Sequence, residues 1–125
     1  MRIALISLAA ALPLAACASS GAQMVENGVP RGSLGVAALE RGDLARAERL
    51  LLDSSLDSDD PARLINLGYV YMEQGRREEA LTTWRAALAA PRHRVVETMA
   101  GREVRTDQLA RTILARHQQS FASNR

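Results

Sequence analysis

Apolar residues between positions 61 and 90 recur at the spacing of α-helices. Leu64, Leu67 and Tyr71 lie three or four residues apart and therefore share one face of a helix, with Ile65 on an adjacent face. Further along the chain, a second apolar stripe comprises Ala80, Leu81, Trp84, Ala87 and Leu88. This pattern predicts two amphipathic helices in succession, and we expect their apolar faces to pack together.

Residues suited to helix ends mark the boundaries of these two helices. Asp60 can cap the first helix, and Pro61 fits its first position, where the missing N–H leaves no hydrogen bond unmade. Gly75 is expected to end that helix. Glu78 and Glu79 then fall in the first turn of the next helix, where negative charge is favourable to the helix dipole. The short connection predicts an antiparallel helix hairpin.

Small residues occur where the two predicted helices would approach each other. Gly68 lies on the first helix and Ala80 on the second. A large side chain at either position would push the two helices apart, so we expect close packing there.

A similar but weaker pattern precedes this hairpin. Ser33 can cap a short helix that runs to Arg41, and Gly42 follows as a helix-ending residue. Asp43 can cap the next helix, which we expect to continue through about Leu52. The chain is therefore predicted to contain a first, shorter helix hairpin.

The two predicted hairpins are copies of one repeat. At an offset of 33 residues the pairs that match in order and spacing are Leu34-Gly35 with Leu67-Gly68, Gly42 with Gly75, Ala47 with Ala80, and Leu51 with Trp84. A recurring period of this length is typical of helical repeat proteins.

The second copy resembles the tetratricopeptide repeat. It reads Leu64-x2-Leu67-Gly68-x2-Tyr71 and then Ala80-x3-Trp84, with Pro91 near the place of the family's closing proline. In the first copy, Arg31 and Ala38 stand where large aromatic residues are usual. The resemblance implies an all-α fold in which residues 33–91 form two repeats, at about 33–58 and 60–91.

Residues 92–121 are expected to form a hairpin and a capping helix, followed by a tail at 122–125. Residues 94–106 flank Ala100-Gly101 and fit either a small β-hairpin or a continuation of helix. Thr106 or Asp107 then caps a last helix, whose apolar residues are Leu109, Ile113 and Leu114. This helix should cover the open end of the second repeat, since stacks of such units need caps.

The N-terminal sequence predicts an export signal. Met1-Arg2 is followed by an apolar stretch from Ile3 to Leu14, which is too short for a permanent membrane span. Leu14-Ala15-Ala16-Cys17 resembles the lipobox of bacterial lipoproteins, which implies a signal peptide at 1–16 and lipidation of Cys17 with palmitate among the acyl chains. An ordinary signal peptide cleaved near Ala16 is the alternative. Residues 17–32 are then the lipidated N-terminus and a flexible tether.

Among bacterial lipoproteins, Asp directly after the cysteine usually marks retention in the inner membrane. Ala18 follows Cys17 here, so the resemblance favours the outer membrane with the domain facing the periplasm. The inner membrane remains an alternative.

Composition and charge narrow the classes of function. Aromatic residues make up only 3% of the chain, which argues against nucleic-acid binding by base stacking. All sixteen basic residues are arginine, and seven of them fall in residues 91–125 beside three acids, whereas residues 37–62 hold seven acids and three arginines. The basic end could meet anionic lipid or an acidic partner, or form a solvated face.

No constellation of residues suggests catalysis or a metal site. His93 and His117 lie far apart and are expected at the surface or at helix ends, and no serine has the context of a nucleophile. Asp57-Ser58-Asp59-Asp60 lacks the glycine and glutamate of a calcium loop. We therefore expect no enzyme, cofactor, metal or small-molecule substrate.

The sequence favours a protein-binding or scaffold module of the cell envelope. The tetratricopeptide resemblance implies a concave partner groove lined by Ala62, Ile65, Asn66, Tyr69 and Met72. Asn66 corresponds to an asparagine that binds a C-terminal carboxylate in some members, but Gly32 and Val36 replace its companions, so binding of such tails is not predicted. The alternatives are a self-associating structural lipoprotein and, less favoured, an enzyme or ligand carrier.

Overall fold

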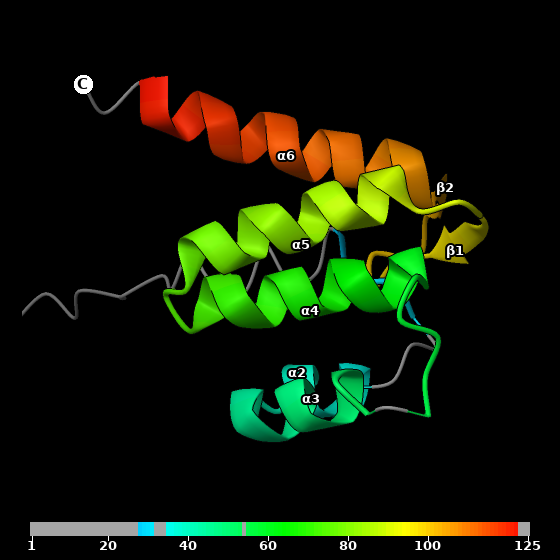
Figure 1. Cartoon of the computed structure of the whole chain (residues 1–125), viewed down its shortest axis with the longest axis vertical. Coiled ribbons are helices and arrows are strands. Elements are labelled where there is room, and N and C mark those ends of the chain that lie inside the picture. The colour runs from blue at the N-terminus through cyan, green and yellow to red at the C-terminus, as the bar shows by residue number, and fades with distance from the viewer. Residues whose placement is uncertain (1–27, 32–34, 54, 123–125) are drawn as a thin grey trace, which may run out of the picture.

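The computed structural model describes residues 28–31, 35–53 and 55–122 of the 125-residue chain. Its elements are α2 (Val36–Glu40), α3 (Leu44–Leu51), α4 (Pro61–Glu73), α5 (Arg77–Ala89), β1 (Val95–Glu97), β2 (Glu103–Arg105) and α6 (Thr106–Ala122). Figure 1 shows α4, α5 and α6 as neighbouring long helices, with α2 and α3 packed on the other side of α4. The predicted fold of two helix hairpins, a small β-hairpin and a capping helix is confirmed.

The centre of the molecule is the contact between α4 and α5. Trp84 is fully buried, and its indole N–H donates to the carbonyl of Ile65 at 3.1 Å. A Cβ atom at Gly68 would lie 2.2 Å from Trp84 Nε1, so only glycine fits there. The predicted close packing of these helices is confirmed, because the indole fills the space that Gly68 leaves.

The predicted helix ends are also confirmed in the second repeat. The Asp60 carboxylate accepts from the backbone N–H groups of Ala62 and Arg63, and Gly75 has φ of 76° after the end of α4. In the first repeat, Asp43 caps α3 by accepting from the N–H of Arg46. Local sequence chemistry therefore sets these boundaries.

A polar network holds the first repeat against the second. Arg76, at the start of α5, forms ion pairs with Glu48 of α3 at 2.7 Å and with Glu79 at 2.5 Å. Gln74 donates to the other Glu48 oxygen at 2.8 Å. The hydrogen bonds from Gln74 and Arg76 lower the pKa of Glu48 below its usual value.

The first helix of the first repeat is shorter than expected. The predicted cap Ser33 lies outside the described residues, and α2 begins only at Val36, after Gly35 with φ of 86°. A copy of α4 shifted by 33 residues would span 28–40, but Pro30 lies in that stretch and disfavours the helical conformation for Val29, the residue before it. The chain therefore takes another path before α2.

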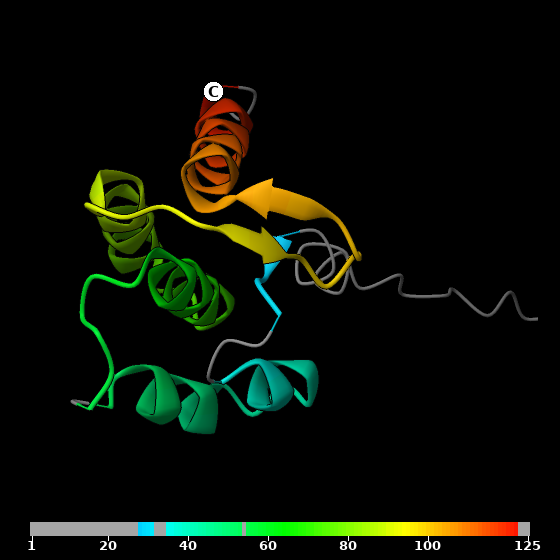
Figure 2. The same ribbon diagram turned by 90° about the vertical axis from the view of Figure 1, so that its right-hand side faces the viewer.

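Residues 28–31, called the N-terminal segment below, pair with the β-hairpin. Pro30 forms an antiparallel bridge with Thr98, Arg31 donates its N–H to the carbonyl of Glu97 at 2.7 Å, and Met99 donates to the carbonyl of Val29 at 3.0 Å. Figure 2 shows this segment beside β1. Val29 is fully buried, so the expected tether at 17–32 is wrong in its last part, where residues 28–31 are packed.

Residues 94–106 form the β-hairpin rather than a helix. β1 and β2 pair antiparallel, with Val96 opposite Val104, and Gly101 has φ of 73° in the connecting turn. The chain then enters α6, which packs against α5 and α4 and ends at Ala122, one residue beyond the predicted bound.

One expectation about the histidines is wrong. His117 of α6 is 6% exposed, and its ring stacks on Trp84 with the ring centroids 4.9 Å apart. Burial lowers its pKa below the usual value. The apolar face of α6 is therefore wider than Leu109, Ile113 and Leu114 alone.

Candidate functional site

The expected groove on α4 is not open in the structure. Of its five predicted residues, four are at most 2% exposed and one is half-buried; the buried ones are Ala62, Ile65, Asn66 and Tyr69, and the half-buried one is Met72. At two of these residues, Asn66 and Tyr69, the N-terminal segment lies against α4. The Asn66 amide donates to the Pro30 carbonyl at 3.4 Å, and the Tyr69 hydroxyl faces Gly28, where a Cβ would lie 2.0 Å from it.

The predicted lipidation site, Cys17, lies outside the described residues. The prediction of lipidation therefore stays a prediction.

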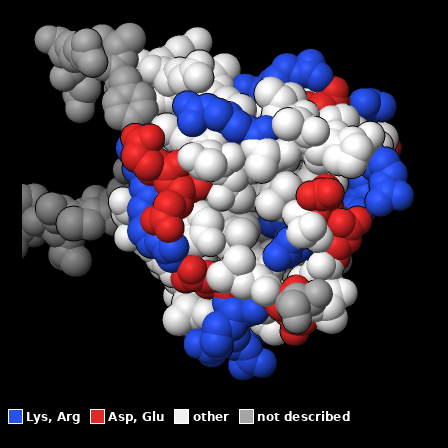
Figure 3. Space-filling model, viewed as in Figure 1, with Lys and Arg blue, Asp and Glu red and all other residues white. Residues whose placement is uncertain are grey.

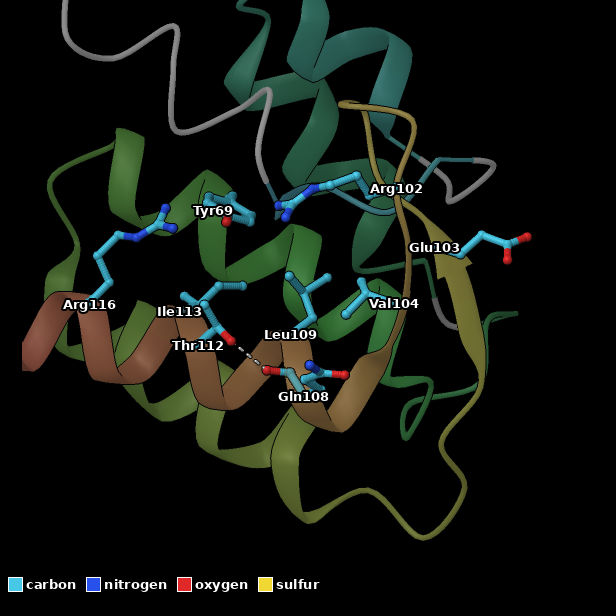
Figure 4. Close-up of a pocket in the computed structure, with 9 residues that line it drawn as sticks. All are labelled: Tyr69, Arg102, Glu103, Val104, Gln108, Leu109, Thr112, Ile113 and Arg116. Atoms are coloured by element: carbon cyan, nitrogen blue, oxygen red, sulfur yellow. Dashed lines mark hydrogen bonds between the residues drawn. The ribbon is translucent and has the colours of Figure 1, made fainter.

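A cavity of about 230 Å³ lies between β2, α6 and Tyr69 of α4. We call it the β2–α6 pocket (Figure 4). Its apolar lining comprises Tyr69, Val104, Leu109 and Ile113, and its polar lining comprises Arg102, Glu103, Gln108, Thr112 and Arg116. Tyr69 therefore still lines the candidate site, but this site is the β2–α6 pocket and not the predicted groove on α4.

The two arginines of the pocket point toward the same place. Figure 4 shows their guanidinium groups on either side of the Tyr69 ring, whereas the Glu103 carboxylate points away from it. Neither guanidinium hydrogen bonds or forms an ion pair with any residue in the part of the chain that the structure describes. Two positive charges therefore stand beside an apolar wall, and no acid among the described residues pairs with either of them.

The other described arginines of the basic end are neutralised. Arg94 pairs with Asp60 at 2.8 Å and Arg92 with Asp57 at 3.6 Å, so they join the basic end to the acidic loop before α4. Asp107 pairs with two further arginines, Arg111 and Arg105. Hydrogen bonds from Arg111 and then Arg105 hold the pKa of Asp107 at about 2.

Tyr69 contributes a neutral phenol to the pocket. Burial raises the pKa of Tyr69 to about 12, and the positive charge of Arg116 acts in the opposite direction. Its ring packs edge-on against Trp84 with the centroids 5.4 Å apart. This wall of the pocket is therefore fixed by the core.

Two other hollows differ from the β2–α6 pocket in the charges that line them. One lies beside Pro61, where Asp57 and Asp60 meet the arginines described above. The other lies against Tyr71 and Glu79, and Arg76 both pairs with Glu79 and lies 4.2 Å from the centre of the Tyr71 ring. The linings also include the carboxylates of Asp59 and Glu78, but neither contains an arginine that lacks an acidic partner among the described residues.

The described residues hold no group of three His, Cys, Asp or Glu side chains that could bind a metal ion. Within the same ranges, every helix is too short or too polar to cross a membrane. On the face in Figure 3, acidic and basic side chains alternate around an uncharged centre without a broad surface of one sign.

Comparison with known families supports the repeat. Residues 28–53 and 61–86 each match the model of the tetratricopeptide repeat, and the second match begins 33 residues after the first. The chain therefore contains two tetratricopeptide-like repeats at the predicted offset. No curated protein matches it, and no solved structure does.

Sequence reasoning missed the β2–α6 pocket. Its arginines, Arg102 and Arg116, lie in the basic end that the charge count singled out. The count could not show which arginines are paired, because the acids that neutralise Arg92 and Arg94 lie more than thirty positions earlier in the chain.

Proposed function

We propose that this protein is a lipid-anchored, non-enzymatic lipoprotein of the bacterial cell envelope that binds another protein through its tetratricopeptide-like domain. The lipobox-like sequence ending at Cys17 supports the anchor, and Ala18 after it supports the outer membrane with the domain in the periplasm. A protein-bound lipid keeps the domain near partners in or beside that membrane.

The observation that carries the binding function is the pair of repeats followed by the β2–α6 pocket. Tetratricopeptide-like repeats serve as protein-interaction modules, and the pocket combines an apolar wall with two arginines that have no acidic partner in residues 28–31, 35–53 and 55–122. Arginine and aromatic residues are enriched where protein interfaces gain most of their binding energy. The pocket replaces the α4 groove as the candidate partner site.

A photo-crosslinking experiment tests this function. We expect benzoylphenylalanine at Thr112, an exposed residue of the pocket, to capture a defined partner in native membranes. The matched control carries the same probe at Arg85, an exposed residue of α5 outside the pocket. Equal capture by both variants, or capture by neither, would contradict a partner site at the pocket.

Self-association is the alternative, since a structural lipoprotein could use the same surfaces on a second copy. Light scattering after size exclusion of the protein in detergent micelles distinguishes the two. Our proposal expects a monomer, and a crosslinked species at twice the mass of this chain would favour self-association.

A further inference from the structure

The basic end of the chain loses most of its charge inside the folded molecule. Arg92, Arg94, Arg105 and Arg111 all pair with aspartates, and among the described residues of this end only Arg102 and Arg116 have no acidic partner. Both of these arginines line the β2–α6 pocket. Within the described part of the basic end, the arginines without an acidic partner therefore both lie at one hollow.

The shape of the pocket limits what can enter. Its volume of about 230 Å³ is smaller than that of pockets for cofactors and drug-sized ligands, which occupy roughly 300–1,000 Å³. Val104, Leu109 and Ile113 provide an apolar surface next to the two guanidinium groups. A side chain with a methylene stem and an anionic head fits both parts of this lining.

Arginine is also the side chain best matched to a carboxylate. The planar guanidinium can donate two parallel hydrogen bonds to the two oxygens, and such bonds are roughly twice as strong as neutral ones. The nearby Glu103 does not compete, since its carboxylate points away from Tyr69 (Figure 4). The pocket is thus selective for an anion that enters from outside.

We propose that the β2–α6 pocket binds a Glu or Asp side chain of an extended acidic segment in the partner protein. The carboxylate lies between Arg102 and Arg116, and the apolar neighbours of that residue cover Val104, Leu109 and Ile113. This proposal rests on the proposed function and names the chemistry of the partner.

An anionic membrane surface is a weaker candidate for the same charges. Attachment to anionic lipid usually takes clusters of about four to eight basic residues. Here two arginines, which have no acidic partner in the part of the chain that the structure describes, flank a hollow with Glu103 at its edge. A projecting side chain therefore meets them better than a flat surface does.

Pairing of a partner strand with the free edge of β2 is also less favoured. β2 has only three residues, and two of them, Glu103 and Arg105, are exposed and charged. Short, charged edge strands are a recognised protection against such pairing. Recognition by side chains in the pocket is the better explanation.

The first test measures binding of two fluorescent peptides to the protein in nonionic detergent micelles. The peptides are acetyl-Gly-Leu-Glu-Leu-Gly-amide and its counterpart with Gln for Glu. We expect the Glu peptide to bind at least about tenfold more tightly, with binding weakened by salt. Equal binding of the two peptides, or binding of neither, would overturn the proposal.

The second test uses arginine variants. Arg102→Gln/Arg116→Gln should remove the preference for Glu, whereas the matched control Arg41→Gln/Arg85→Gln, at exposed arginines outside the pocket, should keep it. All four positions are exposed, so equal melting temperatures verify that the variants fold. An unchanged preference in the pocket variant would count against the proposal.

The outcomes separate this proposal from the proposed function. If the Thr112 probe captures its partner equally in the wild type and the pocket variant, the binding function stands and the acidic-segment proposal fails. If the Thr112 probe captures no partner in the wild type and none in the pocket variant, the binding function itself fails. Arginine-dependent binding of phosphatidylglycerol vesicles, without selective binding of the Glu peptide, would overturn the proposal in favour of lipid.

Discussion

At the residue scale, the fold depends on one glycine facing one tryptophan. Gly68 and Trp84 were both singled out by the repeat pattern, and the structure brings them into contact. This much could be predicted because the spacing within each helix and the short connection place the two residues at the same level. Their partners beyond the hairpin, such as His117 of α6, could not be predicted from that local pattern.

We predict that Gly68→Ala changes stability in opposite directions in two backgrounds. In the wild type the new Cβ meets the buried indole at 2.2 Å, so the substitution should cost about 1–3 kcal/mol. Trp84→Ala alone should cost about 3–5 kcal/mol. In the Trp84→Ala background Gly68→Ala should stabilise by up to about 1 kcal/mol, because alanine is the better helix former. Urea unfolding of the wild type, the two single variants and the double variant measures these changes in stability. If the effects of the two single substitutions simply add in the double variant, the contact between Gly68 and Trp84 is refuted.

Tyr69 shows how a residue's surroundings change its role. The tetratricopeptide resemblance implied that Tyr69 faces an open groove of α4, but in the structure the N-terminal segment and α6 enclose its ring. Burial raises the pKa of its phenol to about 12. A tyrosine in the unfolded chain ionises near pH 10.

This difference predicts a loss of stability at high pH. The stabilisation due to neutral Tyr69 is complete below pH 10 and is lost as the pH rises toward 12, since only the unfolded state ionises in that window. At pH 11 Tyr69 should account for about 1.4 kcal/mol of the loss relative to pH 8, and Tyr69→Phe should remove this part. A smaller loss should remain from Tyr71, because burial raises its pKa as well. Guanidinium unfolding at the two pH values measures the change. An equal loss in the Phe variant would show that another group is responsible.

At the element scale, the two repeats differ in their first helix, and Pro30 is one residue of the first copy that disfavours a helix there. Where α4 has a regular turn, the first copy has a proline and neighbouring glycines, and the N-terminal segment pairs with β1 instead. The degenerate first copy was visible in the sequence. The sequence did not show what this degeneracy leads to, because the pairing of residues 30 and 98 is a long-range contact that no local pattern determines.

The pairing of the N-terminal segment can be tested at Arg31. Arg31→Ala removes the side-chain bond to the Met99 carbonyl, whereas Arg31→Pro also removes the backbone N–H that donates to Glu97 at 2.7 Å. We expect the Pro variant to exchange the Met99 amide hydrogen about fivefold to tenfold faster than the Ala variant, since one hydrogen bond contributes about 1 kcal/mol. Amides within α5 serve as the internal control. Identical exchange at Met99 would mean that the backbone pairing does not hold the segment.

At the scale of the whole molecule, an acidic segment in the middle of the sequence partly neutralises the basic C-terminal segment. The acidic loop before α4 meets Arg92 and Arg94 after α5, and among the described residues of the basic end this leaves Arg102 and Arg116, both in the pocket, without an acidic partner. The acidic segment 37–62 and the basic segment 91–125 could be read from the sequence. The pocket could not, because it depends on which few charges remain after the chain folds.

The attachment of the molecule to a membrane is tested by two substitutions at the N-terminus. Cys17 is the only cysteine of the chain, so Cys17→Ser removes the one thiol that can carry a lipid. We expect palmitate to label the wild type but not this variant, which should leave the membrane fraction. Ala18→Asp provides the control for sorting: it keeps the thiol, so it should still be labelled, but it should move to the inner membrane. Equal labelling of the wild type and Cys17→Ser would refute lipidation at Cys17. If the wild type and both variants are soluble and unlabelled, an ordinary signal peptide is favoured.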